Sequence, residues 1–261
     1  MKLSIVVPAY NEEGRIGRML GAYLPFFEER YGTDFELIVA INGSRDRTEE
    51  IVRGLAAEHP SLRVAVEPKA IGKGGAVMMG GALARGELVG FVDADGSTPP
   101  EAFDDLVANI GDAGLVVASR WLPESEVDPP QPWKRRAASR VFNWLVRRLF
   151  KLHITDTQCG AKLMTAAAWH DIVPNIGITQ WAFDVDMLFK TRRKKYPIKE
   201  IATTWRDVEG SKIRVGKASL EMLLALARLR MIYSPFAFVV KAYDATLERW
   251  FRLRGRRGPA G

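Results

Sequence analysis

The stretch LSIVVPAYNEE, residues 3–13, decides the fold because it joins a buried strand to the start of a helix. Its apolar run is typical of a strand covered on both faces, and Pro8 is expected to end that strand. Asn11 is expected to be the N-cap of a helix, with Glu12 and Glu13 in the first turn. The stretch therefore predicts the first β-α unit of an α/β sheet.

The same alternation continues to about residue 119. Four further runs have the length and apolar content of buried strands, namely FELIVAI (35–41), LRVAVE (62–67), ELVGFVD (87–93) and LVVAS (115–119). Helices are predicted between them over 46–58, near 74–85 and over 100–110. Because buried strands joined through helices form parallel sheets with right-handed crossovers, we predict an α/β domain with a mostly parallel central sheet. Ligands of such sheets bind beyond the carboxyl ends of the strands.

Composition limits the function further. The chain has 261 residues, of which 47% are hydrophobic, so it can bury one large core. Its only cysteine, Cys159, excludes an internal disulfide. No window reaches the ~18 consecutive apolar residues of a membrane-spanning helix, and no charged-then-apolar leader is present. We therefore expect a protein of the cytoplasm that does not cross a membrane.

Charge is unevenly distributed along the chain. The formal net charge is +7, and the excess of lysine and arginine lies after residue 130. Such asymmetry predicts an anionic partner, either lipid headgroups or nucleic acid. Nucleic-acid binding has little support because no known nucleic-acid-reading motif accompanies the charge.

The segment 133–152, WKRRAASRVFNWLVRRLFKL, carries seven basic residues and no acidic ones. Apolar residues at helical spacing predict an amphipathic helix, with Val141, Leu145, Leu149 and Leu152 as the repeating positions. Two interpretations remain open, a core-packed helix with a solvated basic face and a helix lying in a membrane interface. The second is favoured by four aromatic residues among the arginines, Trp133, Phe142, Trp144 and Phe150. We predict a catalytic domain over 1–215 containing this helix, followed by basic amphipathic helices over 216–261.

Two acids stand in the stretch FVDADGSTPPEAF, residues 91–103. In an extended strand Asp93 and Asp95 would face the same side, at the carboxyl end of the fourth strand. Gly96 and Ser97 are expected to break the strand, and Ser97 or Thr98 to cap a helix that begins at the two prolines.

This motif has three possible interpretations. The acids can simply cap the turn, since aspartate is common in turns. They can hold Mg²⁺ or Mn²⁺ together with a diphosphate. Or Asp93 can be the nucleophile of a phosphohydrolase with a D-x-D-G-[ST] motif. Three strands precede the motif, whereas the phosphohydrolase pattern usually opens its domain, so that interpretation is disfavoured. Lys73 in AIGKGGAV (70–77) suits a phosphate, although the segment is not a Walker loop.

Taken in order, a series of motifs resembles the inverting family 2 glycosyltransferases, and within them the dolichyl-phosphate glucosyltransferase branch. The motifs are VVPAYNEE (6–13), NGSRDRT (42–48), GKGGAV (72–77), VDADGS (92–97), ASRW (118–121), DTQCGAKLM (156–164), WAFDVDMLF (181–189) and WRDVEGSKI (205–213). Dolichyl-phosphate mannose synthases are near relatives. The resemblance covers residues 3 to about 232 and implies a GT-A fold.

The resemblance also implies roles for individual residues. It implies a nucleotide-sugar site that includes Pro8, Ala9, Tyr10, Glu12, Asn42, Lys73, Asp93 and Asp95, with Asp93 and Asp95 as ligands of Mg²⁺ or Mn²⁺. It implies an acceptor-phosphate site that includes Arg120, Arg135, Arg206 and Lys212, the last two in a segment that resembles a loop closing over the donor. The implied catalytic residues are Asp95, Arg120 and Asp184, of which Asp184 matches the acid that the family often uses as a base. Asp156 and Gln158 are implied to line the sugar or acceptor pocket.

The implied reaction is transfer of a hexose, with inversion, from a nucleotide sugar to a polyprenyl phosphate at the cytoplasmic face of a membrane. Glucose from UDP-glucose is the first candidate donor and mannose from GDP-mannose the second. The family usually has two acids where this chain has Ile41 and Asn42. An amide does not offer a charge-assisted hydrogen bond, so the choice between uridine and guanosine as the nucleoside of the donor stays open. Attachment to the membrane would be monotopic, through the basic amphipathic segments.

Overall fold

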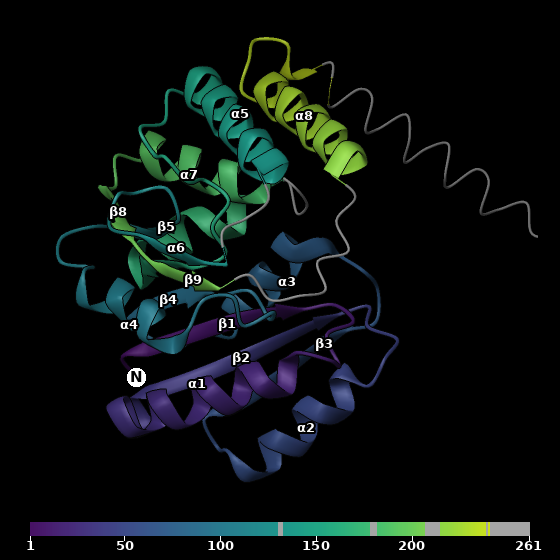
Figure 1. The fold of residues 1–261 in the computed structure, drawn as a ribbon, viewed down its shortest axis with the longest axis vertical. Coiled ribbons are helices and arrows are strands. Elements are labelled where there is room, and N and C mark those ends of the chain that lie inside the picture. Colours follow the sequence, from purple (N-terminus) through teal and green to yellow (C-terminus); the bar gives the residue numbers. More distant parts are fainter. Residues whose placement is uncertain (130–132, 178–181, 207–214, 239, 241–261) are drawn as a thin grey trace, which may run out of the picture. The chain divides into compact units, whose positions relative to one another are not determined.

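The computed structural model describes residues 1–129, 133–177, 182–206, 215–238 and 240 (Figure 1). The chain forms two compact units, Met1–Arg214 and Val215–Gly261. The first unit contains the central sheet and all of the site described below.

Seven strands form the central sheet, in the order β3-β2-β1-β4-β7-β5-β8. In that order their bounds are Leu62–Glu67, Phe35–Asn42, Leu3–Ala9, Leu88–Phe91, Lys162–Thr165, Leu115–Ser119 and Ile198–Ala202. All neighbours are parallel except β7, which runs antiparallel to both β4 and β5. A separate pair of short parallel strands joins β6 (Glu126–Asp128) to β9 (Thr204–Arg206). The mostly parallel α/β sheet expected from the sequence is confirmed.

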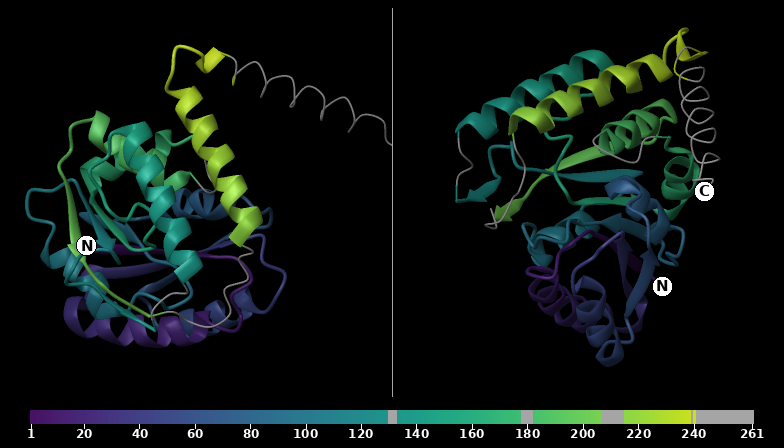
Figure 2. Two further views of the ribbon diagram at one scale, coloured as in Figure 1. Left: turned by 45° about the horizontal axis from the view of Figure 1, so that its top comes forward. Right: turned by 90° about the vertical axis from the view of Figure 1, so that its right-hand side faces the viewer.

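Helices cover both faces of the sheet (Figures 1 and 2). One face carries α1 (Ile16–Tyr31), α2 (Thr48–Glu58) and α4 (Pro100–Ala108), and the other carries α3 (Gly72–Gly81), α6 (Ala166–Ile172) and α7 (Phe183–Arg193). A long helix, α5, spans Trp133–Phe150, and two 3-10 turns span Gly32–Asp34 and Val173–Asn175. Helices lie on both faces because right-handed crossovers put α1 and α2 on one face while the chain moves from β1 to β3, and α3 on the other face when it returns to β4.

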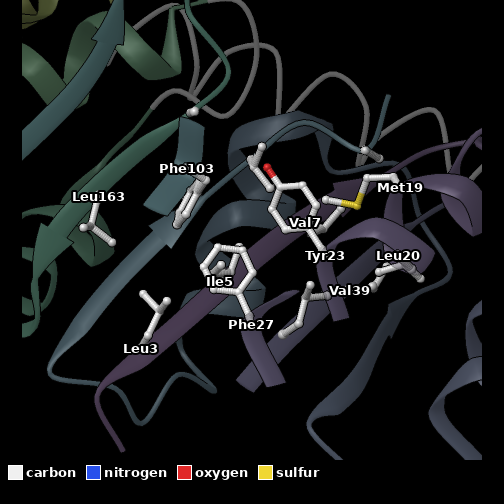
Figure 3. Close-up of a cluster of buried hydrophobic side chains, with 14 of the residues drawn as sticks. Leu3, Ile5, Val7, Met19, Leu20, Tyr23, Phe27, Val39, Phe103 and Leu163 are labelled. Carbon is white, nitrogen blue, oxygen red and sulfur yellow. The ribbon is translucent and has the colours of Figure 1, made fainter. Parts of the chain in front are cut away.

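A core cluster of buried apolar side chains lies between the sheet and the helices α1 and α4 (Figure 3). Tyr23 and Phe27 of α1 meet Phe103 of α4, with ring centroids 6.4 and 6.1 Å apart. Ile5 and Val7 of β1 are fully buried beneath these rings. Burial of this many apolar side chains gives the carboxyl ends of the strands a rigid base.

The start of the first β-α unit differs from the prediction. The strand β1 continues through Pro8 to Ala9. Pro8 is tolerated because β1 pairs with β4 only as far as Val6, so beyond that point one side of the strand needs no hydrogen-bond donors. The predicted cap at Asn11 was wrong, since α1 begins only at Ile16 and Asn11 lies in the left-handed region at φ 54°.

The acidic stretch also differs. The strand β4 ends at Phe91, so Asp93 and Asp95 lie in a turn, and the argument from alternating strand faces does not apply. The residue that caps α4 is Pro99, and neither Ser97 nor Thr98 caps it. The sequence patterns also missed β7 and β8, because both are short and carry lysines within the apolar run.

The described part of the second unit is α8, Val215–Ile232, followed by a short turn. Large apolar side chains are exposed along it, namely Leu223, Leu224, Met231, Phe236 and Phe238. No helix among the described residues is long and apolar enough to span a bilayer.

Candidate active site

The site lies at the carboxyl ends of β1, β2 and β4, where two loops are fastened together. Asn11 N–H donates to Ser44 Oγ at 3.1 Å, and Arg45 N–H donates to Asn11 Oδ1 at 2.8 Å. Glu12 N–H donates to Thr48 Oγ1 at 2.8 Å. These bonds explain the left-handed backbone at Asn11, because its side chain caps the neighbouring loop and not its own helix.

The residues expected to bind the nucleotide lie on this loop pair. Pro8 and Ala9 end β1, and Tyr10 follows with 53% of its surface exposed. Asn42 ends β2, is buried, and its Nδ2 donates to the Ala9 carbonyl at 3.2 Å. Part of the Asn42 amide is therefore already used to join the two strand ends.

Glu12 is close enough to Asp93 and Asp95 for their negative charges to affect its pKa. Its carboxylate accepts two bonds from the Arg15 guanidinium, at 2.7 and 2.8 Å. Burial raises the pKa of Glu12, Arg15 opposes that shift, and the negative charges of Asp95 and Asp93 add to it. The expected nucleotide and metal residues thus share one electrostatic environment.

Asp93 and Asp95 are held by different partners. Asp93 Oδ1 lies 2.6 Å from Nζ of Lys73, which stands in the first turn of α3. Asp95 Oδ1 accepts the Ser97 N–H at 2.9 Å within its own turn. Gly160 packs directly on Asp93, and a Cβ at that position would overlap Asp93 Oδ2. The Asp93 carboxylate is therefore fixed from two sides.

The charges of this cluster stabilise one another. Burial raises the pKa of Asp93, but Lys73, and after it Lys162 and Arg120, lower that pKa below its usual range. Burial alone would lower the pKa of Lys73, but Asp93 and Asp184 raise it above its usual range. Both groups are therefore charged near neutral pH.

Lys162 is a site residue that the sequence patterns did not single out. It lies on β7 with no exposed side-chain area, and its Nζ donates to Asp184 Oδ1 at 2.6 Å. The sequence signal that could have identified it is a lysine inside a short apolar run, because a buried lysine is uncommon unless its charge is paired. Asp184 itself lies in the first turn of α7.

Arg120 and Asp156 form another buried ion pair. The Arg120 Nε and Nη2 atoms donate to the two Asp156 oxygens at 2.7 and 3.0 Å, and the Arg120 N–H adds a third bond at 3.1 Å. The guanidinium also lies over the Trp205 ring, 5.4 Å from its centroid. Burial raises the pKa of Asp156, but Arg120 outweighs it and holds that pKa below its usual range. Arg120 and Asp156, both expected in the site, are thus bonded to each other.

Arg206 reaches the acidic turn through its backbone. Its N–H donates to the Ser97 carbonyl at 2.8 Å, which joins the end of β9 to the turn that holds Asp95. The Arg206 side chain is exposed. Lys212 and the side chain of Arg135 lie outside the described part of the chain, so their expected roles stay predictions.

Two buried donors near Arg120 have no hydrogen-bond partner among the described residues, Trp121 Nε1 and Asn143 Nδ2. Arg140 of α5 lies over the Trp121 ring at 5.3 Å, and Asn143 Oδ1 accepts the backbone and hydroxyl donors of Thr157. The loop 155–158 is therefore tied to α5 as well as to Arg120.

The donor set of the acid pair fits a hard cation only in part. Among the described residues, no group of three or more His, Cys, Asp or Glu side chains is arranged to hold a metal ion. Two carboxylates suit Mg²⁺ or Mn²⁺ when a bound diphosphate supplies further oxygen ligands. The arrangement thus favours a cation held jointly by protein and ligand.

Comparisons with known proteins identify relatives of this chain. The sequence profile "Glycosyl transferase family 2" matches residues 4–172. The dolichyl-phosphate beta-glucosyltransferase of Dictyostelium discoideum is 35% identical over 243 residues, which is 88% of this chain and 74% of that protein. The human protein of the same name is 34% identical over 245 residues, 89% of this chain and 76% of that protein.

The fold also matches solved structures. Glucosyl-3-phosphoglycerate synthase from Mycobacterium tuberculosis, solved in complex with UDP, superposes with a TM-score of 0.67 at 19% identity, covering 88% of this chain and 79% of that one. A second structure of that synthase, with Mn²⁺, UDP and its product, gives the same TM-score and coverage. At this identity the likeness concerns the fold, and it confirms the GT-A expectation.

Proposed function

The chain belongs to glycosyltransferase family 2, and from this premise we propose that it transfers glucose from UDP-glucose to dolichyl phosphate or a similar polyprenyl phosphate. The observation that carries the proposal is the acid pair after β4, which stands beside Lys73 in a chain 31–35% identical to dolichyl-phosphate beta-glucosyltransferases. The solved synthase that shares the fold binds UDP with Mn²⁺, which supports a nucleotide-diphosphate donor.

The proposed reaction is a single displacement. An oxygen of the acceptor phosphate forms a bond to the anomeric carbon of glucose, and the bond from that carbon to the diphosphate breaks. UDP leaves with the electron pair, and the configuration inverts, so an α-linked donor gives a β-linked lipid product. The acceptor phosphate is largely ionised near pH 7, so the chain needs to orient it and does not need to remove a proton.

Donor binding is assigned to the end of β4 and to α3. Lys73 stands in the first turn of a helix, where both its ammonium and the helix N-terminus favour a phosphate. Asp93 and Asp95 would hold the divalent cation, which when bound neutralises charge on the diphosphate. Lys73 is paired with Asp93, so the ammonium lies next to the place where the diphosphate is expected.

Acceptor binding is assigned to the arginines at the ends of β5 and β9. Arg120 already makes a bidentate ion pair with Asp156, so a phosphate bound by Arg120 would be an additional partner of that guanidinium. The Arg206 side chain is exposed and can contact a phosphate from solvent. Arg135 and Lys212 remain predicted acceptor contacts. Asp184 is assigned to orienting groups near Lys73, because no proton needs to be abstracted from an ionised phosphate.

We also propose that the first unit docks on a membrane through α5. This helix buries Phe142 and Phe150, which the interfacial interpretation had placed at the membrane, but it exposes Trp133 at 72% and Trp144 at 62%. Its exposed residues also include Val141, Leu149 and four arginines, at 136, 140, 147 and 148. A face of exposed tryptophans and arginines without acidic residues suits an anionic bilayer surface.

A donor panel tests the enzyme proposal. Purified protein is incubated with dolichyl phosphate, Mg²⁺ or Mn²⁺, and radiolabelled UDP-glucose or GDP-mannose. We expect labelled lipid from UDP-glucose. If GDP-mannose gives product and UDP-glucose does not, the mannosyltransferase alternative is favoured. Asn42, at the end of β2, does not exclude that alternative. Absence of lipid product together with hydrolysis of p-nitrophenyl phosphate would favour the phosphohydrolase alternative, for which the fold and family offer no support.

A further inference from the structure

Lys162 and Asp184 form an ion pair close enough to the acid pair for the Lys162 charge to act on Asp93. The Lys162 side chain is 0% exposed and that of Asp184 is 8% exposed, and the Nζ to Oδ1 distance is 2.6 Å. The same ammonium donates to the Cys159 carbonyl at 2.6 Å. An ammonium removed from water this completely is costly unless its partners are well placed. Its position is therefore closely constrained.

The pair shares its surroundings with the proposed donor site. Phe91, the last residue of β4, contacts two ammonium groups, since Nζ of Lys162 and Nζ of Lys73 each lie 5.5 Å from its ring centroid. Phe91 also packs edge-on against Phe183, the residue before Asp184, with centroids 6.0 Å apart. The charges of Asp184 and Lys162 act on Lys73 and Asp93 respectively, as the pKa shifts above indicate. The Lys162–Asp184 pair therefore acts electrostatically on the Lys73–Asp93 pair.

We propose that Lys162 is a positioning residue for glycosyl transfer. Its ammonium holds the Asp184 carboxylate in a single orientation in the first turn of α7, beside the donor site, where Asp184 accepts hydrogen bonds from hydroxyl groups of the donor sugar. A carboxylate free to rotate would lose this alignment, and misalignment lowers the rate of a displacement more than it weakens binding. The inference rests on the proposed function and adds a residue to it.

Four variants of the full chain test this role, Lys162→Met, Lys162→Arg, Asp184→Asn and the double variant Lys162→Met with Asp184→Asn. Transfer is measured at saturating and limiting concentrations of the donor that gives product, and folding is followed by circular dichroism. We expect Lys162→Met to lower kcat by about 10²-fold with KM for the donor within about twofold. Lys162→Arg should restore most of kcat, because it keeps a charge that can pair with Asp184.

The double variant separates positioning from folding. If the two residues act as a unit, it should be no slower than the slower single variant, because each single change already removes the pair. Lys199→Met is the matched control. Lys199, like Lys162, lies on a strand and donates one hydrogen bond to another side chain, at 2.9 Å to Asn109 Oδ1. That hydrogen bond is exposed and lies away from the site. This control should keep the wild-type kcat.

Three results would overturn the inference. One is a folded Lys162→Met protein with wild-type kcat, and another is a double variant whose loss is the product of the two single losses. The third applies if Lys162→Met does not fold, and it is a folded double variant with wild-type kcat. A folded double variant that is as slow as Asp184→Asn supports the pair instead. Failure of the wild-type protein to transfer any sugar contradicts the proposed function and this inference together. Normal wild-type transfer with any of these three results contradicts only the role of Lys162.

Discussion

Asp95 differs from Asp93 in that, among the described residues, its carboxylate is held by a backbone N–H and not by an ion pair. Its Oδ1 accepts the Ser97 N–H, so an asparagine could keep that bond while removing the charge. We expect Asp95→Asn to fold normally and to lower kcat by roughly 10²–10³-fold, because the proposed mechanism uses negative charge at this point to hold a cation against the diphosphate. Radiolabelled lipid product and UDP binding in the presence of Mn²⁺ measure the effect.

Asp105→Asn is the control for that change. Asp105 is an exposed residue on the neighbouring helix α4, so its charge lies outside the acidic turn. It should leave both kcat and UDP binding unchanged. A wild-type kcat for Asp95→Asn would remove the acid pair from the mechanism.

Gly160 lies against the Asp93 carboxylate and leaves no room there for a side chain. A Cβ at this position would overlap Asp93 Oδ2, so Gly160→Ala must displace either the carboxylate or the loop that precedes β7. A displacement of about 1 Å in a reacting constellation is enough to reduce the rate about 10²-fold. We expect that reduction in kcat, with a folded protein by circular dichroism.

Gly54→Ala is the matched glycine control. Gly54 lies within α2, and a Cβ there would have nothing within 4 Å. Alanine should raise the free energy of unfolding by about 0.5–1 kcal/mol and leave kcat unchanged. Equal kcat for Gly160→Ala and the wild type would show that Asp93 does not need its present position.

At the level of elements, α5 has two faces with different tasks. Phe150 is fully buried, so Phe150→Ala should lower the free energy of unfolding by about 3–5 kcal/mol. Trp144 is exposed on the same helix, so Trp144→Ala should leave stability within about 0.5 kcal/mol of the wild type. We expect Trp144→Ala to weaken binding to phosphatidylserine-containing vesicles several-fold, because an interfacial tryptophan contributes to membrane affinity.

Vesicle sedimentation and denaturant unfolding separate these effects. Added salt should weaken vesicle binding by the wild type and by Trp144→Ala, because salt screens the attraction between exposed arginines and anionic lipids. Unchanged vesicle binding by Trp144→Ala would argue against docking through α5, and the helix would then be only a core element with a solvated basic face.

The strand β7 is the element on which the site depends most. It enters the sheet antiparallel between β4 and β5, and its register pairs Lys162 with Phe91. That pairing brings Gly160 onto Asp93 and the Lys162 ammonium onto Asp184. Neither contact is visible in local periodicity, because each joins residues from separate parts of the chain.

For the whole molecule, buried ion pairs predict how stability depends on pH. The folded pKa of Asp156 lies below its unfolded value of ~3.9, since Arg120 outweighs burial. Such a group stabilises the fold fully above the unfolded pKa and loses that contribution as pH falls through the folded pKa. Glu36 behaves alike, since bonds from Ser4, Arg63 and Arg85 outweigh its burial and lower its pKa. We expect the free energy of unfolding to fall as pH drops below about 4.

Denaturant unfolding at a series of pH values checks this expectation. Asp156→Asn should be less stable near pH 7 by about 3–5 kcal/mol, because it leaves the Arg120 guanidinium, 12% exposed, without its counter-charge. Its further loss below pH 4 should be smaller than that of the wild type. Parallel pH curves for the two proteins would show that the Arg120–Asp156 pair does not control acid stability.

Periodicity along the chain was sufficient to predict the α/β class, the five strands up to residue 119 and an acid pair at the end of the fourth. These features are local, since burial on two faces produces continuous apolar runs and turn residues mark their ends. Motif order added the family, which the comparisons confirm. The individual roles of the site residues stay predictions.

Long-range pairing was beyond such patterns. Arg120 meets Asp156 from 36 positions away, and Lys162 meets Asp184 from 22 positions away. Whether a charged side chain in a sequence is solvated or buried against a partner depends on which strands become neighbours, and the insertion of β7 between β4 and β5 sets that. The family and the fold class could therefore be predicted from the sequence, whereas the charge pairing of the site follows from the topology of the folded sheet.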